Sequence, residues 1–242
     1  MGRLDLQRVS AQLHGRRLRG PLLYREQTTS TNDDALALAA AGADEGTVVI
    51  AGAQVQGRGR RQRSWAGHPD HSLLFTLVLR PTLPPELFPR LVNMIGVGVA
   101  AGCAHAAACP VGTKWPNDVM AAGRKIAGIL VEARAPGYAV AGIGINVLGD
   151  PTDFPPELRD RAGTLASCAT TGLTREDVLA TVLNETDRWY DVLLRGEWDQ
   201  VLARQRELET TLGQEHTVLV GDEPISGMVR DLSPEGGLVI DH

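Results

Sequence analysis

Aromatic side chains are scarce in this 242-residue sequence, in which Phe, Trp and Tyr make up 4% of the residues. A nucleic-acid site that depends on base stacking needs several exposed aromatics, and the composition offers few. Positive charge is also lacking, because 24 Lys and Arg stand against 29 Asp and Glu, for a net charge of −5. Domains that bind nucleic acid in bulk are usually basic. The balance therefore favours a soluble protein that has at most a local basic site.

Cysteines are few, and long apolar runs are missing. The three cysteines, Cys103, Cys109 and Cys168, form no CxxC pair and no Cys/His metal-ligand spacing. Their odd number argues against a disulfide framework, so we expect free, buried thiols in a reducing cytosol. Residues 1–20 contain charges but no apolar core of a signal peptide, and no stretch approaches the ~20 apolar residues that span a bilayer. We therefore expect a cytoplasmic protein without a membrane segment.

The pattern of apolar residues and breakers predicts an α+β fold, with a mixed β-sheet and packed helices. We expect helices over residues 30–42, 86–107, 174–194 and 197–208, and strands over residues 47–53, 72–80, 111–115, 118–121, 125–133 and 138–147. Glycines within residues 86–107 predict that this helix packs closely against a neighbour. Residues 1–24 hold one weak helical pattern, too little for a helix-turn-helix domain. From Gly213 onward, short strands over residues 216–220, 225–231 and 237–241 predict a small separate β-module.

Residues 54–65, with the sequence QVQGRGRRQRSW, form the densest polar feature and directly follow a predicted strand. Four arginines occupy six positions and alternate with glycine. Glycine lets the backbone approach a ligand, and guanidinium groups suit phosphate and carboxylate. Such a loop should repel itself when empty, so we expect it to be mobile without an anion and ordered by its ligand. Taken alone, it is also consistent with a solvated basic turn or a nucleic-acid patch.

Four further motifs carry polar residues at the ends of predicted elements. Ser30-Thr31-Asn32 begins a helix, where such side chains accept free backbone N–H groups. KWPND, at residues 114–118, ends a strand at a sharp turn, and KIAGILVE, at residues 125–132, places a second lysine at the start of a strand. GIGINV, at residues 142–147, is a strand interrupted by glycines, which weaken a strand unless a backbone or ligand must come close. Each motif alone is weak evidence.

Together and in this order, the motifs resemble those of the biotin–protein ligase family, over roughly residues 22–240. The resemblance implies a class II synthetase-like catalytic core at residues 22–210. An N-terminal extension at residues 1–21 precedes it, and an SH3-like β-module at residues 211–242 follows. That module is shorter than is usual in the family. It further implies a ligase that uses ATP and Mg²⁺ to convert biotin to biotinyl-5′-AMP and pyrophosphate. The enzyme would then transfer biotin to a lysine of a biotin carboxyl carrier protein.

The resemblance also implies a role for individual residues. Lys114 and Arg60 would be the catalytic residues. The residues that would bind biotin are Ser30, Thr31, Asn32, Gln54, Gly57, Arg58, Arg60, Lys114 and Gly128. Those that would bind ATP or the adenylate are Arg58, Arg60, Arg63, Trp65, Lys114, Asn117, Lys125 and Asn146. Mg²⁺ would enter with ATP, near Asn146. Without a recognisable DNA-binding domain, we expect a ligase that is not a repressor, binds no DNA and forms a homodimer through sheet edges.

One residue departs from the family pattern, and two other functions remain open. Gln62 stands where the family usually has glycine. If that position needs a positive φ, the strain costs ~1 kcal/mol. A lipoate or octanoate protein ligase would share the fold but handle an acyl chain. A biotin-responsive regulator would bind biotin without transferring it.

Overall fold

The computed structural model describes residues 3–62, 65, 67–134, 137–170, 172–221 and 223–241. Its main body is a seven-stranded sheet with the order β1-β2-β3-β7-β6-β5-β4. The strands are β1 (Leu22–Thr28), β2 (Val48–Gln54), β3 (Ser72–Leu79), β4 (Gly112–Lys114), β5 (Asp118–Ala121), β6 (Arg124–Arg134) and β7 (Tyr138–Asn146). The β1–β2 pair is parallel and the other pairs are antiparallel. The mixed α+β sheet predicted from the sequence is confirmed.

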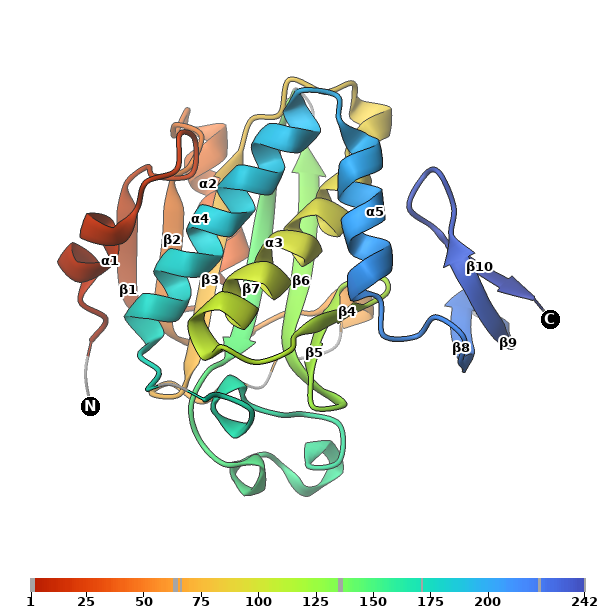
Figure 1. Ribbon diagram of the computed structural model, residues 1–242. Coiled ribbons are helices and arrows are strands. Elements are labelled where there is room, and N and C mark those ends of the chain that lie inside the picture. The colour runs from red at the N-terminus through yellow and green to blue at the C-terminus, as the bar shows by residue number, and fades with distance from the viewer. Residues whose placement is uncertain are drawn as a thin grey trace.

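Helices cover the two faces of this sheet unequally (Figure 1). On one face lie α3 (Arg90–Ala107), α4 (Arg175–Leu194) and α5 (Trp198–Leu208), and on the other lies α2 (Thr31–Ala40). Strand β3 is buried along its whole length. Its odd-numbered residues, such as Phe75, belong to the main core with α3 and α4, whereas Val78 packs in a smaller cluster with α2. This alternation follows from the two-residue period of a strand.

Helix α3 is apolar and lies in the core. By length and composition alone it could cross a membrane, since its 18 residues have a mean hydropathy of 1.2; this is closer to a membrane span than we expected from the sequence. In the structure, 67% of it is buried inside the protein. A Cβ on Gly98 would lie 2.6 Å from the Cα of Thr186, and one on Gly102 would lie 2.5 Å from the Cα of Val182. These two glycines let α3 approach α4 closely, as predicted.

Three details of the main body differ from the sequence predictions. Strand β1 was not predicted, because only the first three of its seven residues are apolar and it lies at the sheet edge. The helix expected from residue 86 begins at Arg90, after a short 3-10 turn. The cysteines were expected to be free. Cys103 is free and buried, but Cys109 and Cys168 form a disulfide with their Cα atoms 6.0 Å apart. They are 59 residues apart in the sequence, and the fold alone brings them together.

The N-terminal segment packs on α4 through one carboxylate. Helix α1 (Leu6–Gln12) forms where the sequence has its weak helical pattern. After it, the backbone N–H groups of Arg16, Arg17 and Leu18 donate to the Asp187 carboxylate at 2.9, 2.7 and 2.6 Å. Asp187 is only 4% exposed. The segment before β1 is therefore an integral part of the main body.

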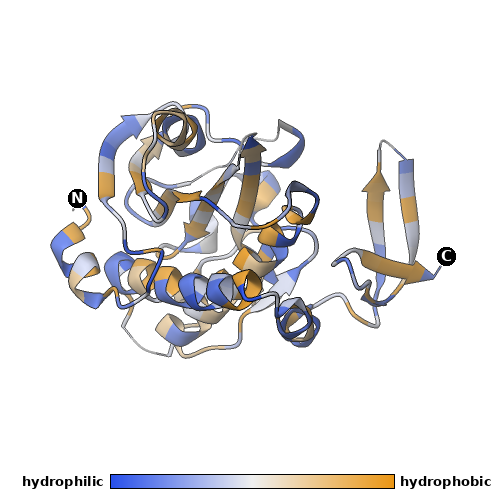
Figure 2. Cartoon of the chain, turned by 90° about the horizontal axis from the view of Figure 1, so that it is seen from above, coloured by the Kyte–Doolittle hydropathy of each residue, from blue (hydrophilic) through white to orange (hydrophobic). Residues whose placement is uncertain are grey.

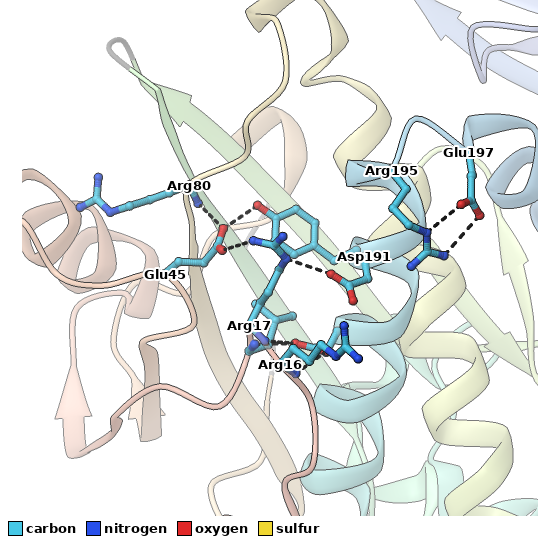
Figure 3. Close-up of polar contacts among 10 residues, drawn as sticks. Arg16, Arg17, Glu45, Arg80, Asp191, Arg195 and Glu197 are labelled. Atoms are coloured by element: carbon cyan, nitrogen blue, oxygen red, sulfur yellow. Dashed lines mark hydrogen bonds and ion pairs between the residues drawn. The ribbon is translucent and has the colours of Figure 1, made fainter.

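A second carboxylate, on Glu45 before β2, joins three parts of the fold (Figure 3). It accepts hydrogen bonds from the Tyr190 hydroxyl at 2.7 Å, the Arg80 backbone N–H at 3.0 Å and the Arg17 guanidinium at 3.3 Å. Arg17 also donates to Asp191 at 2.9 Å. Burial, and then the bond to Glu45, raise the pKa of Tyr190, so this phenol stays neutral. The network ties α4 to the sheet edge on the face away from the motifs.

The C-terminal β-module stands beside the main body, beyond α5 (Figures 1 and 2). It consists of β8 (Glu215–Val220), β9 (Glu223–Leu232) and β10 (Leu238–Asp241), in the antiparallel order β10-β9-β8, close to the three predicted strands. The carbonyl of Gly236 accepts from the Trp115 indole at 3.1 Å and from the Asn93 amide at 2.9 Å. The Trp198 indole donates to the carbonyl of Pro234 at 2.6 Å. The module is thus bonded to α3, α5 and the turn after β4.

Candidate functional site

The strand register gathers the sequence motifs on the face of the sheet that carries α2. Directly paired residues form a row across the sheet, and paired positions share a face. The row runs Ala51, Leu74, Gly144, Gly128, Asp118, Lys114. Neighbouring strands lie ~4.8 Å apart, so three strand spacings, ~14 Å, separate Lys114 from Gly144. Residues from three motifs therefore border one region of the sheet.

The centre of this row is a slot formed by two paired glycines. A Cβ on Gly144 would lie 2.5 Å from Cε2 of Trp65, and a Cβ on Gly128 would lie 2.8 Å from its Cζ3. The indole of Trp65 therefore rests where two side chains are missing, and its backbone N–H donates to the Gly57 carbonyl at 2.9 Å. Within the described residues its Nε1 is buried without a hydrogen-bond partner. The slot accommodates a flat ring.

A chain of polar side chains borders the slot at the start of α2. Gln54 Oε1 accepts from the backbone N–H of Thr31 at 2.7 Å and from its hydroxyl at 3.0 Å. The Thr76 hydroxyl, 2.8 Å from that of Thr31, donates to Asn32 Oδ1 at 2.7 Å. Asn32 in turn donates to Glu132 at 2.8 Å. Ser30 makes no side-chain cap, contrary to our expectation, and the N–H of Thr31 is bonded to Gln54. These amides and hydroxyls can hydrogen-bond a polar ring.

The Arg/Gly loop borders the slot, and one of its arginines already has acidic partners. Arg58 forms an ion pair with Asp33 and lies 3.7 Å from Glu132. These carboxylates reduce the self-repulsion that we expected in the empty loop. Burial, and then the charge of Arg61, lower the pKa of Arg60, against the opposing effect of Asp118. Arg60 is therefore partly desolvated and close enough to Asp118 to feel its charge. Arg63 lies outside the described residues.

Strain in the loop falls one position before the one we expected. Arg61 adopts a φ of 54°, in the left-handed region, whereas Gln62 is not among the non-glycine residues of positive φ. The departure at Gln62 therefore carries no such strain in this structure. A left-handed non-glycine residue persists only where its surroundings hold it. Arg61 has such surroundings in the β-module.

Of the two motif lysines, Lys125 lies nearer the slot. Its Nζ forms a 2.6 Å ion pair with Asp118 and lies 5.4 Å from the Trp65 ring centroid. It also lies 3.2 Å from the position of a Cβ on Gly128. Lys114 lies on β4, two strands beyond the β6 strand of Lys125. It is near enough to His216 for its charge to lower the pKa of that imidazole, after the larger effect of burial. The geometry therefore favours Lys125, predicted only as a nucleotide contact, for the central cation.

Two predicted residues make contacts that shape the site. The side-chain amide of Asn117 donates to the backbone carbonyl of Ile129 at 2.9 Å, and the backbone carbonyl of Asn117 accepts from the Ile129 N–H at 3.0 Å. It thereby fixes the turn between β4 and β5 against β6. Asn146 is 4% exposed, and its amide donates to the Gly163 carbonyl at 3.2 Å. Among the residues that the structure describes, its Oδ1 accepts one long, 3.5 Å bond, from the Ser72 hydroxyl, so this oxygen retains capacity for a ligand.

Beside Asn146 lies a cavity of about 130 Å³. Its walls include Gly67, Ser72 and the stacked imidazoles of His68 and His71, whose centroids are 4.3 Å apart. In the part of the chain that the structure describes, no group of three or more His, Cys, Asp or Glu side chains could hold a metal. A larger cavity, of about 340 Å³, lies between residues 14–16 and α4, on the opposite face of the sheet. The motifs contribute nothing to it.

Sequence reasoning missed several residues that border the slot. Asp33 and Glu132 neutralise Arg58, Asp118 pairs with Lys125, and Thr76 joins the polar chain. A signal existed for Thr76, the only hydroxyl within the apolar strand sequence LLFTLVL. The others required the strand register, which no single motif reveals.

Comparison with solved structures defines the class of protein. The chain is similar to the biotin protein ligase from Aquifex aeolicus in complex with biotin and ATP, with a TM-score of 0.78 and 28% identity over 91% of each chain. The fold is therefore that of a biotin protein ligase catalytic core with a small C-terminal sheet. The family model described as the biotin/lipoate A/B protein ligase family matches residues 24–150. The chain belongs to this family.

Two curated relatives narrow the comparison. The bifunctional ligase/repressor BirA of Bacillus subtilis is 38% identical over 67% of this chain and 51% of its own length. The biotin–[acetyl-CoA-carboxylase] ligase of Mycobacterium tuberculosis is 34% identical over 89% of this chain and 81% of its own. The chain thus spans about half the length of the first of these relatives. The family resemblance inferred from the motifs is confirmed.

Proposed function

We propose that this protein is a biotin–protein ligase, which activates biotin with ATP to biotinyl-5′-AMP and transfers biotin to a carrier lysine. The observation that carries the proposal is the slot between Gly128 and Gly144, bordered by Lys125 and by the Arg/Gly loop. The slot holds the Trp65 ring and so places the loop beside Lys125, and the neighbouring cations suit a carboxylate and a phosphate. The named activity of the Mycobacterium tuberculosis relative supports the same conclusion.

In the first step, the biotin carboxylate attacks the α-phosphate of ATP and pyrophosphate leaves. Negative charge grows on the transferred phosphoryl oxygens, where fixed cations stabilise it. Lys125 borders the slot and Arg58 and Arg60 belong to the Arg/Gly loop beside it, so we assign that stabilisation to these three cations. The polar chain from Gln54 to Glu132 would bind the ureido ring of biotin.

In the second step, the amine of a carrier lysine attacks the mixed anhydride and AMP leaves. This step needs no nucleophile from the enzyme, only an anhydride kept away from water. The Arg/Gly loop would cover the anhydride, with Trp65 as its apolar contact. We infer that the acceptor is a lysine of a biotin carboxyl carrier protein, in keeping with the name of the M. tuberculosis relative, a biotin–[acetyl-CoA-carboxylase] ligase.

Mg²⁺ would enter with the triphosphate of ATP. Mg²⁺ commonly takes one or two protein oxygens plus substrate phosphates and water, and the weakly engaged Oδ1 of Asn146 fits that pattern. When bound, the ion neutralises phosphate charge. We also propose that the protein acts in the cytoplasm as a ligase and not as a repressor. The net charge of −5 supports the absence of bulk DNA binding, and a gel-shift assay with promoter DNA tests it. A homodimer through sheet edges remains our proposal, to be tested by analytical ultracentrifugation.

One experiment tests the proposed function directly. The protein is incubated with ATP·Mg²⁺, radiolabelled biotin and a biotin carboxyl carrier domain, and label on the carrier is measured. Parallel reactions contain lipoate or octanoate in place of biotin. Label on a carrier lysine supports the proposal. Activation of lipoate or octanoate alone would identify an acyl ligase, and biotin binding without pyrophosphate release would identify a regulator.

Gly144→Ala is expected to weaken biotin binding by about tenfold or more, since overpacking a filled site costs about 1–3 kcal/mol. The added methyl would lie 2.5 Å from the Trp65 ring and narrow the slot. Isothermal titration calorimetry with biotin measures the change. Gly172→Ala is the matched control, because its methyl would have no neighbour within 4 Å. Unchanged affinity in Gly144→Ala would show that biotin does not use the slot.

A further inference from the structure

The Arg/Gly loop is bonded to the C-terminal module through one side chain. Nη2 of Arg61 donates to the backbone carbonyl of Leu219 at 3.1 Å and to that of Gly221 at 2.6 Å. Leu219 lies in β8, one residue before its end at Val220, and Gly221 belongs to the turn before β9. These residues lie some 160 positions apart in the chain. The contact therefore joins the cover of the site to a module that stands beside the main body.

The backbone of Arg61 supports a specific role for this contact. Its φ of 54° is unfavourable for any residue with a side chain. Strained residues of this kind persist where neighbouring bonds hold them and often lie at functional segments. The two bonds to the module supply such a hold. A solvated arginine would have no reason to keep this conformation.

The module also contacts the turn that follows β4. Glu209, which precedes β8, accepts from the Trp115 backbone N–H at 3.0 Å, and Gly236 accepts from the Trp115 indole at 3.1 Å. His216 on β8 lies within reach of the charge of Lys114. The module and the residues that lead into it therefore border both segments that would enclose the nucleotide.

We propose that Arg61 is a positioning residue through which the C-terminal module holds the Arg/Gly loop over the site. The proposal rests on the proposed function, because it assigns to the module a part in retaining the adenylate. Two arginines of the loop have partners elsewhere in the fold, Arg58 on the carboxylates Asp33 and Glu132 and Arg61 on the module. The first contact lies beside the proposed biotin site, and the second joins the loop to the module. Losing the second removes the bonds that connect Arg61 to the module.

The test compares Arg61→Ala with Arg61→Lys in the full chain. In Arg61→Ala, biotinyl-5′-AMP should dissociate about tenfold faster, the effect expected from losing one or two exposed charge-assisted hydrogen bonds. Arg61→Lys keeps the charge and a donor, so it should restore the dissociation rate to within about threefold. Release of labelled adenylate from a preformed complex gives the rate. The KM for biotin should rise more than kcat falls, because Arg61 touches no reacting atom.

Hydrogen exchange of the ligand-free protein gives a second readout that does not depend on catalysis. Arg61→Ala should speed exchange at residues 57–62 and, at the same time, at residues 215–221. Arg204→Ala is the matched control, since it removes an exposed arginine whose partner, Glu207, lies on the same helix. Faster exchange confined to the loop, or wild-type adenylate release, would overturn the proposal. If the wild-type protein makes no adenylate, the proposed function fails, and the exchange data alone decide whether Arg61 couples module and loop.

Discussion

Replacing Lys125 with alanine is expected to slow biotin-dependent exchange between ATP and pyrophosphate by about 100- to 1,000-fold, the usual loss for one preorganised group that stabilises developing charge. Lys125 lies beside the slot, with its Nζ 3.2 Å from the position of a Cβ on Gly128, and its 2.6 Å bond to Asp118 fixes its position before any ligand arrives. Without it, charge on the transferred phosphoryl group would meet an unpaired Asp118 carboxylate. Exchange of labelled pyrophosphate into ATP measures the first step alone.

Lys114 provides the comparison for this prediction. It lies on β4, two strands beyond the strand that carries Lys125, and borders the β-module, so Lys114→Ala should cost clearly less than Lys125→Ala. Lys125→Arg keeps the charge and should retain more activity than Lys125→Ala. If Lys114→Ala proves the more damaging change, the central role returns to Lys114, as the motifs first indicated.

Replacing Asp187 with alanine is expected to lower the free energy of unfolding by about 3 kcal/mol, because buried donors that lose a charged acceptor are costly. Three consecutive backbone N–H groups, from Arg16 to Leu18, bond to this one carboxylate. Alanine would leave these N–H groups without their acceptor and loosen the segment that leads into β1. Urea denaturation followed by circular dichroism measures the loss.

The control for Asp187 is Glu207→Ala. Glu207 pairs with Arg204 on an exposed helix face, and such pairs contribute about 0–1 kcal/mol. Asp187→Asn keeps one acceptor and should lie between the two. Because Asp187 lies on the face opposite the slot, the folded fraction of the alanine variant should bind biotin normally. A loss of less than about 1 kcal/mol would show that water or a rearranged loop replaces the carboxylate.

The sequence predicted the main helices and most strands because their apolar periods are long and their ends are marked by glycine or proline. The turn of Ala122 and Gly123 between β5 and β6 is an example, since both residues adopt the positive φ that suits a tight hairpin. Strand β1 was not predicted because the second half of the strand is polar and mostly exposed. The Cys109–Cys168 disulfide was not predicted because the periodicity of apolar residues does not indicate which distant segments of the chain come into contact.

The candidate site was predicted in its composition but not in its arrangement. The motifs placed cations and glycines in the right segments, and the loop was correctly separated from the strands. The motifs could not reveal that Gly128 pairs with Gly144 in the strand register. They also could not reveal that Asp118 is the register partner of Lys114 and forms an ion pair with Lys125. Register is fixed by packing across the whole sheet, so a single strand does not contain it. The preference for Lys125 over Lys114 depends on that register.

The slot exists because Gly128 and Gly144 have no side chains, and this limits how mutation can change its size. Every substitution of Gly128 or Gly144 adds atoms, so mutation can make the slot smaller but not larger. A descendant of this protein that accepts a bulkier acid would have to gain room elsewhere, by shortening Trp65 or by trimming the threonines near Gln54. Substitutions that change the substrate should therefore appear first at Trp65 and at the threonines near Gln54, while Gly128 and Gly144 stay unchanged.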